Sequence, residues 1–263
     1  MIPVEGLEIV GITDVGRIRT RNEDAIDWDA AIGLAVLADG LGGHNAGNVA
    51  SALAVASIKT ELQQARYQRA GQAPVQGRDG ADSDQAGDDA ALVAESVYHA
   101  NRALYETVQR EPRYAGMGTT VVLALFADHL VTISHVGDSR AYRLRRGQLE
   151  QLTVDHSLVQ ELLRTGYLTE EEARVSEHRN VITRALGIDR EVEPDVEQYR
   201  VELGDIYLLC SDGLSNLLSE EAISAGLASA ATDMLQAARE LVNMANERGG
   251  YDNISVILVR VGS

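Results

Sequence analysis

Cysteine, lysine and long apolar runs are scarce in this sequence of 263 residues. Its one cysteine, Cys210, excludes an intrachain disulfide and is compatible with a reducing compartment. Lys59 is its only lysine, and 23 basic residues against 40 acidic ones give a net charge of -17. So acidic a chain does not suit sequence-independent binding to nucleic acid. No segment reaches the ~18 apolar residues of a membrane span, and the first residues lack the basic and apolar regions of a secretory signal.

The length suits one large domain or two small ones. The motifs described below are far apart in the sequence, and a site that they share needs one body, so we expect a single domain over residues 1–263. We further expect a cytoplasmic monomer with no nucleic-acid partner and no membrane partner.

Apolar runs of strand length recur along the chain, and many are rich in valine and isoleucine, which favours strands over short buried helices. They lie at 7–13, 32–38, 119–126, 130–136, 141–145, 194–201, 205–211 and 254–261. Helical patterns lie at 46–65, 90–110, 156–165, 169–175, 219–228 and 232–248. The strands come in consecutive groups with helices gathered between them. This pattern favours α+β layers with antiparallel sheets over a doubly wound parallel sheet.

Local signals refine this pattern in two places. The last helix is predicted to begin with Thr232 as its N-cap and to end at Gly249-Gly250. Residues 66–89 are polar, with few apolar side chains to bury, and are predicted to form a mobile connection between the two long helices.

Aspartates stand at the ends of four apolar runs spread over the whole chain. They are Asp39, Asp138, Asp212 and Asp252. Carboxylates placed where strands leave a core can converge on one point, and hard divalent cations hold such acids together. Glycine follows both Asp39 and Asp212, and it lets the backbone approach a ligand closely. The first inference is therefore a metal centre.

Each motif also has a structural explanation when it is taken alone. Residues 39–44, Asp-Gly-Leu-Gly-Gly-His, could be a glycine-rich turn between a strand and a helix. Asp138 and the pair Asp252-Asn253 could be turn residues, because Asp and Asn side chains bond to nearby backbone. Residues 17–24 alternate three arginines ahead of two acids and could form a solvated edge strand.

Taken together, the motifs resemble those of a known family, the metal-dependent serine/threonine phosphatases of the protein phosphatase 2C type. The matching motifs, in order, are Arg19 with Glu23-Asp24, Asp39-Gly40, Gly137-Asp138-Ser139-Arg140, Asp212-Gly213 and Asp252-Asn253. The form of residues 39–44 is similar to the bacterial branch, and the resemblance runs from about residue 8 to 260. It implies a four-layer αββα sandwich of two antiparallel sheets flanked by antiparallel helix pairs, in agreement with the α+β pattern.

The resemblance also implies a centre of two Mn²⁺ or Mg²⁺ ions with a third, weaker site. The direct ligands would be Asp39, Asp212, Asp252 and the carbonyl of Gly40. Glu23 and Asp24 would hold metal-bound waters, and Asp138 would share the third site with Asp212. Two cations ~3.5 to 4 Å apart can share one water, lower its pKa towards neutrality and aim it at phosphorus.

Arg19 would grip the substrate phosphate, because a guanidinium presents a planar fork matched to phosphate oxygens. Only Arg19 stands at the family's spacing from Glu23, so Arg17 and Arg21 are expected at the surface. His44 would help to protonate the leaving group.

Other chemistries lack their required residues. A cysteine phosphatase needs an arginine six positions after its nucleophile, where Asn216 stands, so Cys210 is expected to be a buried strand residue. A P-loop needs Gly-Lys-Ser/Thr, and Lys59 lies inside a helical pattern. An aspartyl-phosphate enzyme built on Asp27 would need an apolar strand directly before it, and residues 23–26 make a poor one. The six histidines show no paired spacing typical of zinc ligands.

The resemblance predicts hydrolysis of phosphoserine and phosphothreonine on proteins, opposing a serine/threonine kinase. The rival interpretation is a catalytically silent module that binds phosphoproteins or acts as a scaffold with the same fold. Residues 155–187 lie where family members carry a flap beside the active site, and a purely structural helical hairpin is the alternative there.

Overall fold

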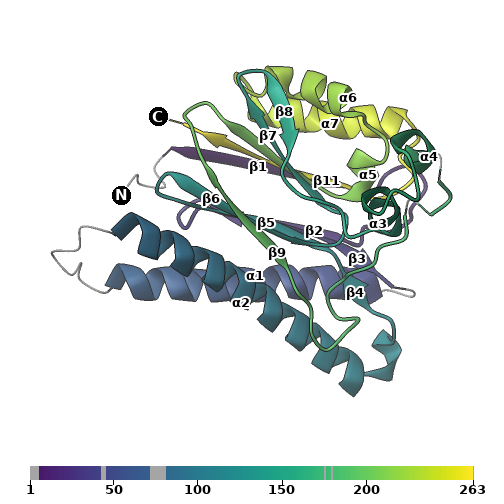
Figure 1. Ribbon diagram of the computed structural model, residues 1–263, viewed down its shortest axis with the longest axis horizontal. Helices are drawn as coiled ribbons and strands as arrows, with labels where there is room; N and C mark the ends of the chain where they lie inside the picture. The colour runs from purple at the N-terminus through teal and green to yellow at the C-terminus, as the bar shows by residue number, and fades with distance from the viewer. Residues whose placement is uncertain (1–5, 43–45, 72–80, 175, 179, 263) are drawn as a thin grey trace.

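Two antiparallel sheets lie face to face between layers of helices in the computed structural model, which describes residues 6–42, 46–71, 81–174, 176–178 and 180–262 (Figure 1). The first sheet has the strand order β1 (Leu7–Asp14), β11 (Ile254–Val261), β10 (Ile206–Cys210), β7 (Arg140–Arg145) and β8 (Gln148–Gln151). The second has the order β2 (Asp24–Asp29), β3 (Leu34–Leu41), β5 (Val121–Ala127), β6 (Leu130–Val136) and β9 (Asp195–Arg200), with β4 (Gly118–Thr119) paired to β3.

Helices cover the outer face of each sheet and one end of the sandwich (Figure 1). The long helices α1 (Ala46–Gly71) and α2 (Ala81–Arg110) lie on the second sheet, and α6 (Glu220–Gly226) and α7 (Met234–Glu247) lie on the first. The short helices α3 (Leu158–Arg164), α4 (Glu170–Arg174) and α5 (Asp212–Ser215) lie at the end of the sandwich, and 3₁₀ turns lie at Pro112–Tyr114 and Leu227–Ser229. The predicted α+β sandwich is confirmed.

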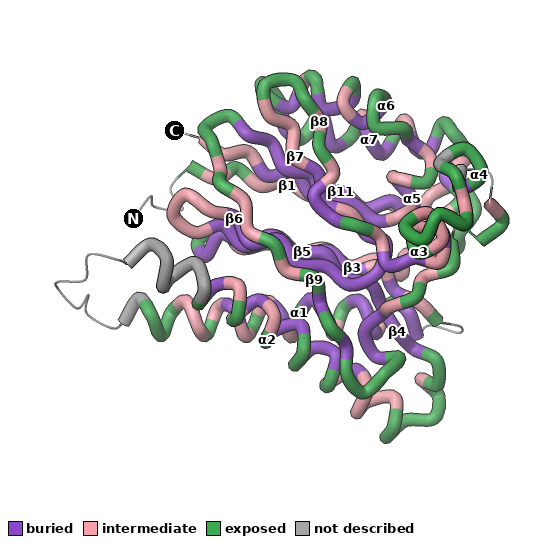
Figure 2. Tube along the Cα trace, viewed as in Figure 1, coloured by how far each residue is buried: buried purple, intermediate pink, exposed green. Residues whose placement is uncertain are grey.

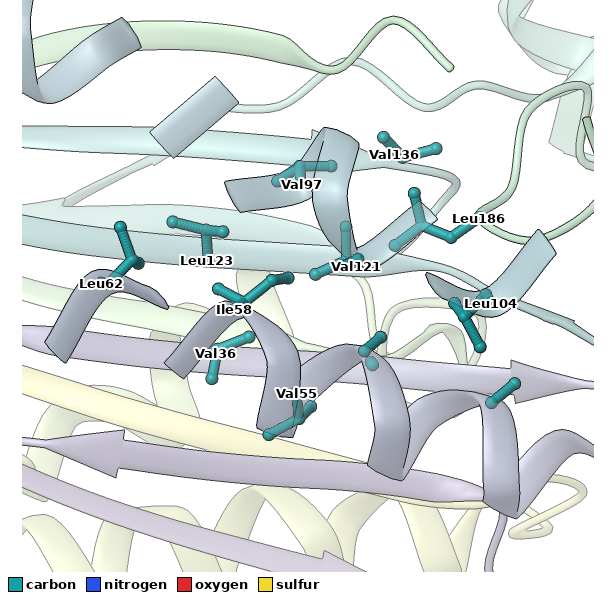
Figure 3. Packing of buried hydrophobic residues seen from close by; sticks show 14 of the residues in the cluster. Val36, Val55, Ile58, Leu62, Val97, Leu104, Val121, Leu123, Val136 and Leu186 are labelled. Atoms are coloured by element: carbon teal, nitrogen blue, oxygen red, sulfur yellow. The ribbon is translucent and has the colours of Figure 1, made fainter. Parts of the chain in front are cut away.

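Alternation along the strands produces three apolar layers (Figure 2). Successive strand residues point to opposite faces. Val36 of β3 therefore packs under the helices, with Ile58 and Leu62 of α1 above it (Figure 3), whereas Leu37 faces the other sheet. Burying each such side chain contributes roughly 1.5–3 kcal/mol. These layers hold the strand ends, and hence the site residues, in fixed positions.

The predicted mobile connection at 66–89 is wrong at both of its ends, because α1 continues to Gly71 and α2 begins at Ala81. Residues 72–80 lie outside the described residues. Where the helices pass each other, Arg66 and Arg69 bond to the buried carboxylate of Asp89 at 3.2 and 2.7 Å. Paired charges replace apolar contacts there, so a polar composition did not indicate loss of structure.

Other local predictions also need correction. Residues 17–23 form a loop in place of the solvated edge strand considered as one alternative, and the edge strand β2 begins only at Asp24. The N-cap of α7 is Asp233 in place of Thr232, and its carboxylate accepts a hydrogen bond from Gln236 N at 2.9 Å. The predicted end of this helix before Gly249 is confirmed. Among the described residues, we find no helix with the length and apolarity that crossing a membrane requires.

Candidate metal centre

The predicted site residues converge on one cavity of about 90 Å³ at the end of the two sheets. Its lining includes seven of them: Arg19, Glu23, Asp39, Gly40, Asp138, Asp212 and Asp252. Asp24 adjoins the cavity, because it pairs with Asp39 across β2 and β3. His44 lies outside the described residues, so its predicted role stays a prediction.

Asp39 is held in place by its backbone, and its carboxyl group lies against those of Asp24 and Asp212. Its N–H donates to Thr120 Oγ1 at 3.1 Å, and its carbonyl accepts from Thr119 Oγ1 at 2.8 Å. Both threonines are buried. Their role could not be predicted from the sequence, since two adjacent threonines carry no distinctive signal.

The two Asp-Gly motifs are explained by close approach of backbone. A Cβ atom on Gly40 would lie 2.1 Å from the carbonyl oxygen of Gly47, and one on Gly213 would lie 2.0 Å from that of Asn253. Both distances are far below van der Waals contact, so the residue after each aspartate has no room for a side chain. The glycines therefore pack the acid-bearing segments tightly together.

Asn253 ties the segment before β11 to the loop before β2 through three hydrogen bonds. Its Oδ1 accepts from Glu23 N at 2.8 Å, and its Nδ2 donates to the carbonyls of Val15 and Arg21 at 3.1 and 2.9 Å. The motif Asp252-Asn253 was noted in the sequence without a role for its asparagine. Asn253 fixes the loop before β2, and that loop carries Glu23 and Arg19.

Arg19 lies at the rim of the cavity and donates from Nη2 to Asp252 Oδ2 at 2.7 Å. This hydrogen bond is the main cause that raises the pKa of the guanidinium. Half of the Arg19 side chain is exposed, so one face of the guanidinium remains open to a ligand. Arg17 and Arg21 are exposed and do not line the cavity, as predicted.

The carboxylates of the cavity repel one another. Burial, followed by neighbouring carboxylates, raises the pKa of Asp24 and of Asp212 to about 6 and that of Asp138 to about 7. The same two causes raise the pKa of Asp39 well above its ordinary value. Without a compensating charge, this cluster takes up protons near neutral pH.

A pair of hard divalent cations fits this donor set. Asp24 Oδ1 and Asp212 Oδ1 are buried and have no hydrogen-bond partner, which is costly for an acceptor that could otherwise be solvated. Carboxylate and carbonyl oxygens are the ligands that Mn²⁺ and Mg²⁺ prefer. Cations bound to Asp212 directly and to Asp24 through water would satisfy these oxygens and offset the repulsion.

A larger cavity of about 870 Å³ adjoins the first and shares Asp138 and Asp212 with it. Its other wall includes α3, which lies within the predicted flap at 155–187. Arg140 donates to both oxygens of Asp155 at 2.8 and 2.6 Å, which ties the base of this segment to β7. That this segment acts as a flap beside the active site stays a prediction.

Residues outside the cavity have structural roles. Cys210 is fully buried in β10, as predicted, and burial raises its thiol pKa to about 12. Lys59 Nζ pairs with Asp27 Oδ1 at 2.7 Å, away from the acids of the site.

The fold also brings two histidines together that are far apart in the sequence. Their rings, His135 and His156, stack with centroids 4.6 Å apart and planes 16° apart. Nearly parallel rings cannot both direct an in-plane lone pair at one ion, although Asp195 lies beside them. His156 instead accepts a hydrogen bond from Gly137 N at 3.1 Å, which supports the turn that carries Asp138.

Known proteins share this sequence and architecture. The family model described as protein phosphatase 2C matches residues 17–255. Protein phosphatase PhpP of Streptococcus pneumoniae is 37% identical over 256 residues, which cover 96% of this chain and 97% of PhpP. Serine/threonine protein phosphatase PstP of Mycobacterium tuberculosis is 38% identical over 249 residues, which cover 95% of this chain. The match spans only 44% of the length of PstP.

Solved structures agree with the sequence matches. A crystal structure of M. tuberculosis PstP matches with a TM-score of 0.85 and 36% identity, and covers 98% of this chain and 100% of that chain. Another, of the PstP catalytic domain in complex with two manganese ions, matches with a TM-score of 0.81 and 36% identity over 98% of this chain and 99% of that chain. Together with the converging acids, these matches show that the chain belongs to the protein phosphatase 2C family of metal-dependent serine/threonine phosphatases.

Proposed function

We propose that this protein hydrolyses phosphoserine and phosphothreonine on other proteins with the help of two Mn²⁺ or Mg²⁺ ions. The observation that carries the proposal is the single cavity in which acids from separate segments meet beside Arg19, with two buried carboxylate oxygens unpartnered. A silent scaffold is expected to lack at least one of these acids, whereas this sequence carries every acid that the family resemblance implies.

The ions would be held directly by the side chains of Asp39, Asp212 and Asp252 and by the carbonyl of Gly40. Glu23 and Asp24 would act through water, and Asp138 would complete a third, weaker site. When bound, the cations supply positive charge that lowers the pKa of water and stabilises charge on a phosphoryl group. The acids would hold the cations, and so this positive charge, at the cavity.

Arg19 would bind the phosphate. Its guanidinium is fixed by Asp252 on one side and half exposed on the other, so it can present N–H donors to phosphate oxygens at the cavity rim. Because the same carboxylate would also bind a cation, Asp252 would set the spacing between phosphate and metal. His44 would assist the departure of the serine or threonine oxygen.

The substrates would be phosphorylated proteins that a serine/threonine kinase modifies, and that kinase is itself a candidate substrate. The segment 155–187 would form one wall of the substrate path, because α3 lines the larger cavity beside the metal acids. We propose a single phosphatase domain that acts as a monomer in the cytoplasm, where its lone cysteine would stay reduced.

The test is hydrolysis of para-nitrophenyl phosphate and of phosphoserine, phosphothreonine and phosphotyrosine peptides with saturating Mn²⁺. We expect turnover that a chelator abolishes and that Asp212→Ala lowers by at least 10²-fold. Asp27→Asn is the matched control, since Asp27 is an acid of β2 outside the cavity. No turnover with Mn²⁺ would support the silent scaffold, and turnover limited to phosphotyrosine would contradict the substrate assignment.

A further inference from the structure

Two buried serine hydroxyls converge on one oxygen of Asp24. Ser211 Oγ donates to Asp24 Oδ2 at 2.9 Å, and Ser255 Oγ donates to the same oxygen at 2.6 Å. Both serines are fully buried, Ser211 directly after β10 and Ser255 within β11. Asp24 begins β2 in the other sheet, so these bonds cross the space between the sheets at the site.

Further donors support this pair and fix the direction of each bond. The Ser255 hydroxyl donates its one hydrogen to Asp24. In its hydrogen bond with Thr13 Oγ1 at 2.8 Å, Thr13 must therefore be the donor. Thr13 in turn accepts from Asn22 Nδ2 at 2.6 Å. The backbone N–H of Ser255 donates to Ser211 Oγ at 3.0 Å. Apart from a long contact of 3.4 Å from Ser211 Oγ to the carbonyl of Asn253, these hydrogen bonds all point towards the carboxylate of Asp24.

The two oxygens of Asp24 consequently differ. Oδ2 takes both hydroxyls, whereas Oδ1 is buried with no partner. The hydroxyls also oppose the effect of burial, since each lowers a pKa that burial raises. A carboxylate held through one oxygen has a fixed orientation, and its other oxygen is reserved for whatever charge enters the cavity.

We propose that Ser211 and Ser255 are positioning residues that orient Asp24 for metal binding, with Thr13 as the outer link. They act through Asp24, and none of the three contributes to the lining of the cavity. The inference rests on the proposed function, because it gives Asp24 a place beside the metal ions.

The test is the Mn²⁺ dissociation constant of Ser211→Ala and Ser255→Ala, measured by titration calorimetry. Loss of a residue that supports a metal site weakens binding by 10- to 100-fold, so we expect roughly tenfold for each variant. Turnover at low Mn²⁺ should fall in parallel and largely recover at saturating Mn²⁺. Ser134→Ala is the matched control, because Ser134 is a fully buried strand serine whose hydroxyl has no partner.

Thr13→Val covers the case in which the serine variants do not fold. Thr13 is exposed and valine has nearly its shape, so the variant keeps the fold while it removes the donor to Ser255. We expect Mn²⁺ binding to weaken by roughly two- to fivefold, less than for the serine variants, because Thr13 acts on Asp24 only through Ser255.

Unchanged Mn²⁺ affinity in all three variants would overturn the inference. The same holds if they lower the melting temperature equally with and without Mn²⁺, as a purely structural role would. Wild-type protein that neither binds Mn²⁺ nor turns over substrate would instead contradict the proposed function, so the two failures are distinguishable.

Discussion

No carboxylate in the metal centre acts alone. Asp39 faces Asp24 across β2 and β3, and Asp212 raises the pKa of both Asp39 and Asp138. Burying each ionised carboxylate costs free energy, and this cost falls when neighbouring carboxylates share a cation. The effect of removing one carboxylate on metal binding should therefore depend on how many of the ions it contacts.

Asp138 and Asp39 should therefore respond differently to truncation. Asp138→Ala is expected to leave two Mn²⁺ bound and to remove only the weaker third ion, because Asp138 would serve only that site. Asp39→Ala is expected to abolish binding of both core ions. Native mass spectrometry at graded Mn²⁺ concentrations counts the ions directly. Loss of all ions from Asp138→Ala would contradict this assignment.

At the level of elements, the junction between α5 and β11 sets the position of Asp212 relative to Asp252. Gly213 lies one residue into α5 and meets the carbonyl of Asn253, directly before β11. The contact leaves no space for one methyl group. Tight packing of backbone on backbone thus controls the distance between two of the proposed metal ligands.

Gly213→Ala should therefore impair both stability and metal binding. Overpacking costs about 1–3 kcal/mol, and relief by movement of α5 would displace Asp212. We expect a lower melting temperature and at least tenfold weaker Mn²⁺ binding, by thermal denaturation and calorimetry. Gly204→Ala is the control: Gly204 has a φ of +87° with open space around its Cβ position, so it should cost about 1 kcal/mol and leave Mn²⁺ affinity unchanged.

The elements also show what sequence could reveal. Apolar runs identified β5, β6, β10 and β11 because these strands are buried on both faces, and the motif order identified the acids that line the cavity. The strand β2 was not predicted because three of its six residues are aspartates and it lacks an apolar run. Ser211, Ser255 and Thr120 also escaped, since their roles depend on contacts between strands far apart in the sequence.

For the whole molecule, the metal centre links stability to pH. The raised pKa values mean that the metal-free fold binds protons more tightly than the unfolded chain. Stability from these protonated acids is fully present below about pH 4, the unfolded pKa, and is lost as pH rises through about 6 to 7. Bound cations should reverse this loss.

The rise in melting temperature on adding Mn²⁺ should accordingly be small at pH 5 and large at pH 8, because at low pH the ions must displace protons. Paired thermal denaturation with Mn²⁺ and with a chelator measures the difference. His156, whose pKa burial lowers to about 4, affects both samples alike and cancels. A rise that does not change with pH would contradict the link.

The last strand, β11, lies in the interior of its sheet, between β1 and β10. Asp252 and Asn253 lie just ahead of it, so Asn253 reaches Glu23, in the loop before β2, only after the 230-residue interval between them has been synthesised. Contacts of such large sequence separation form slowly in folding. During translation the acids on β2 and β3 therefore emerge before Asp252 and Asn253, and we expect the cavity to remain unassembled until β11 has been made.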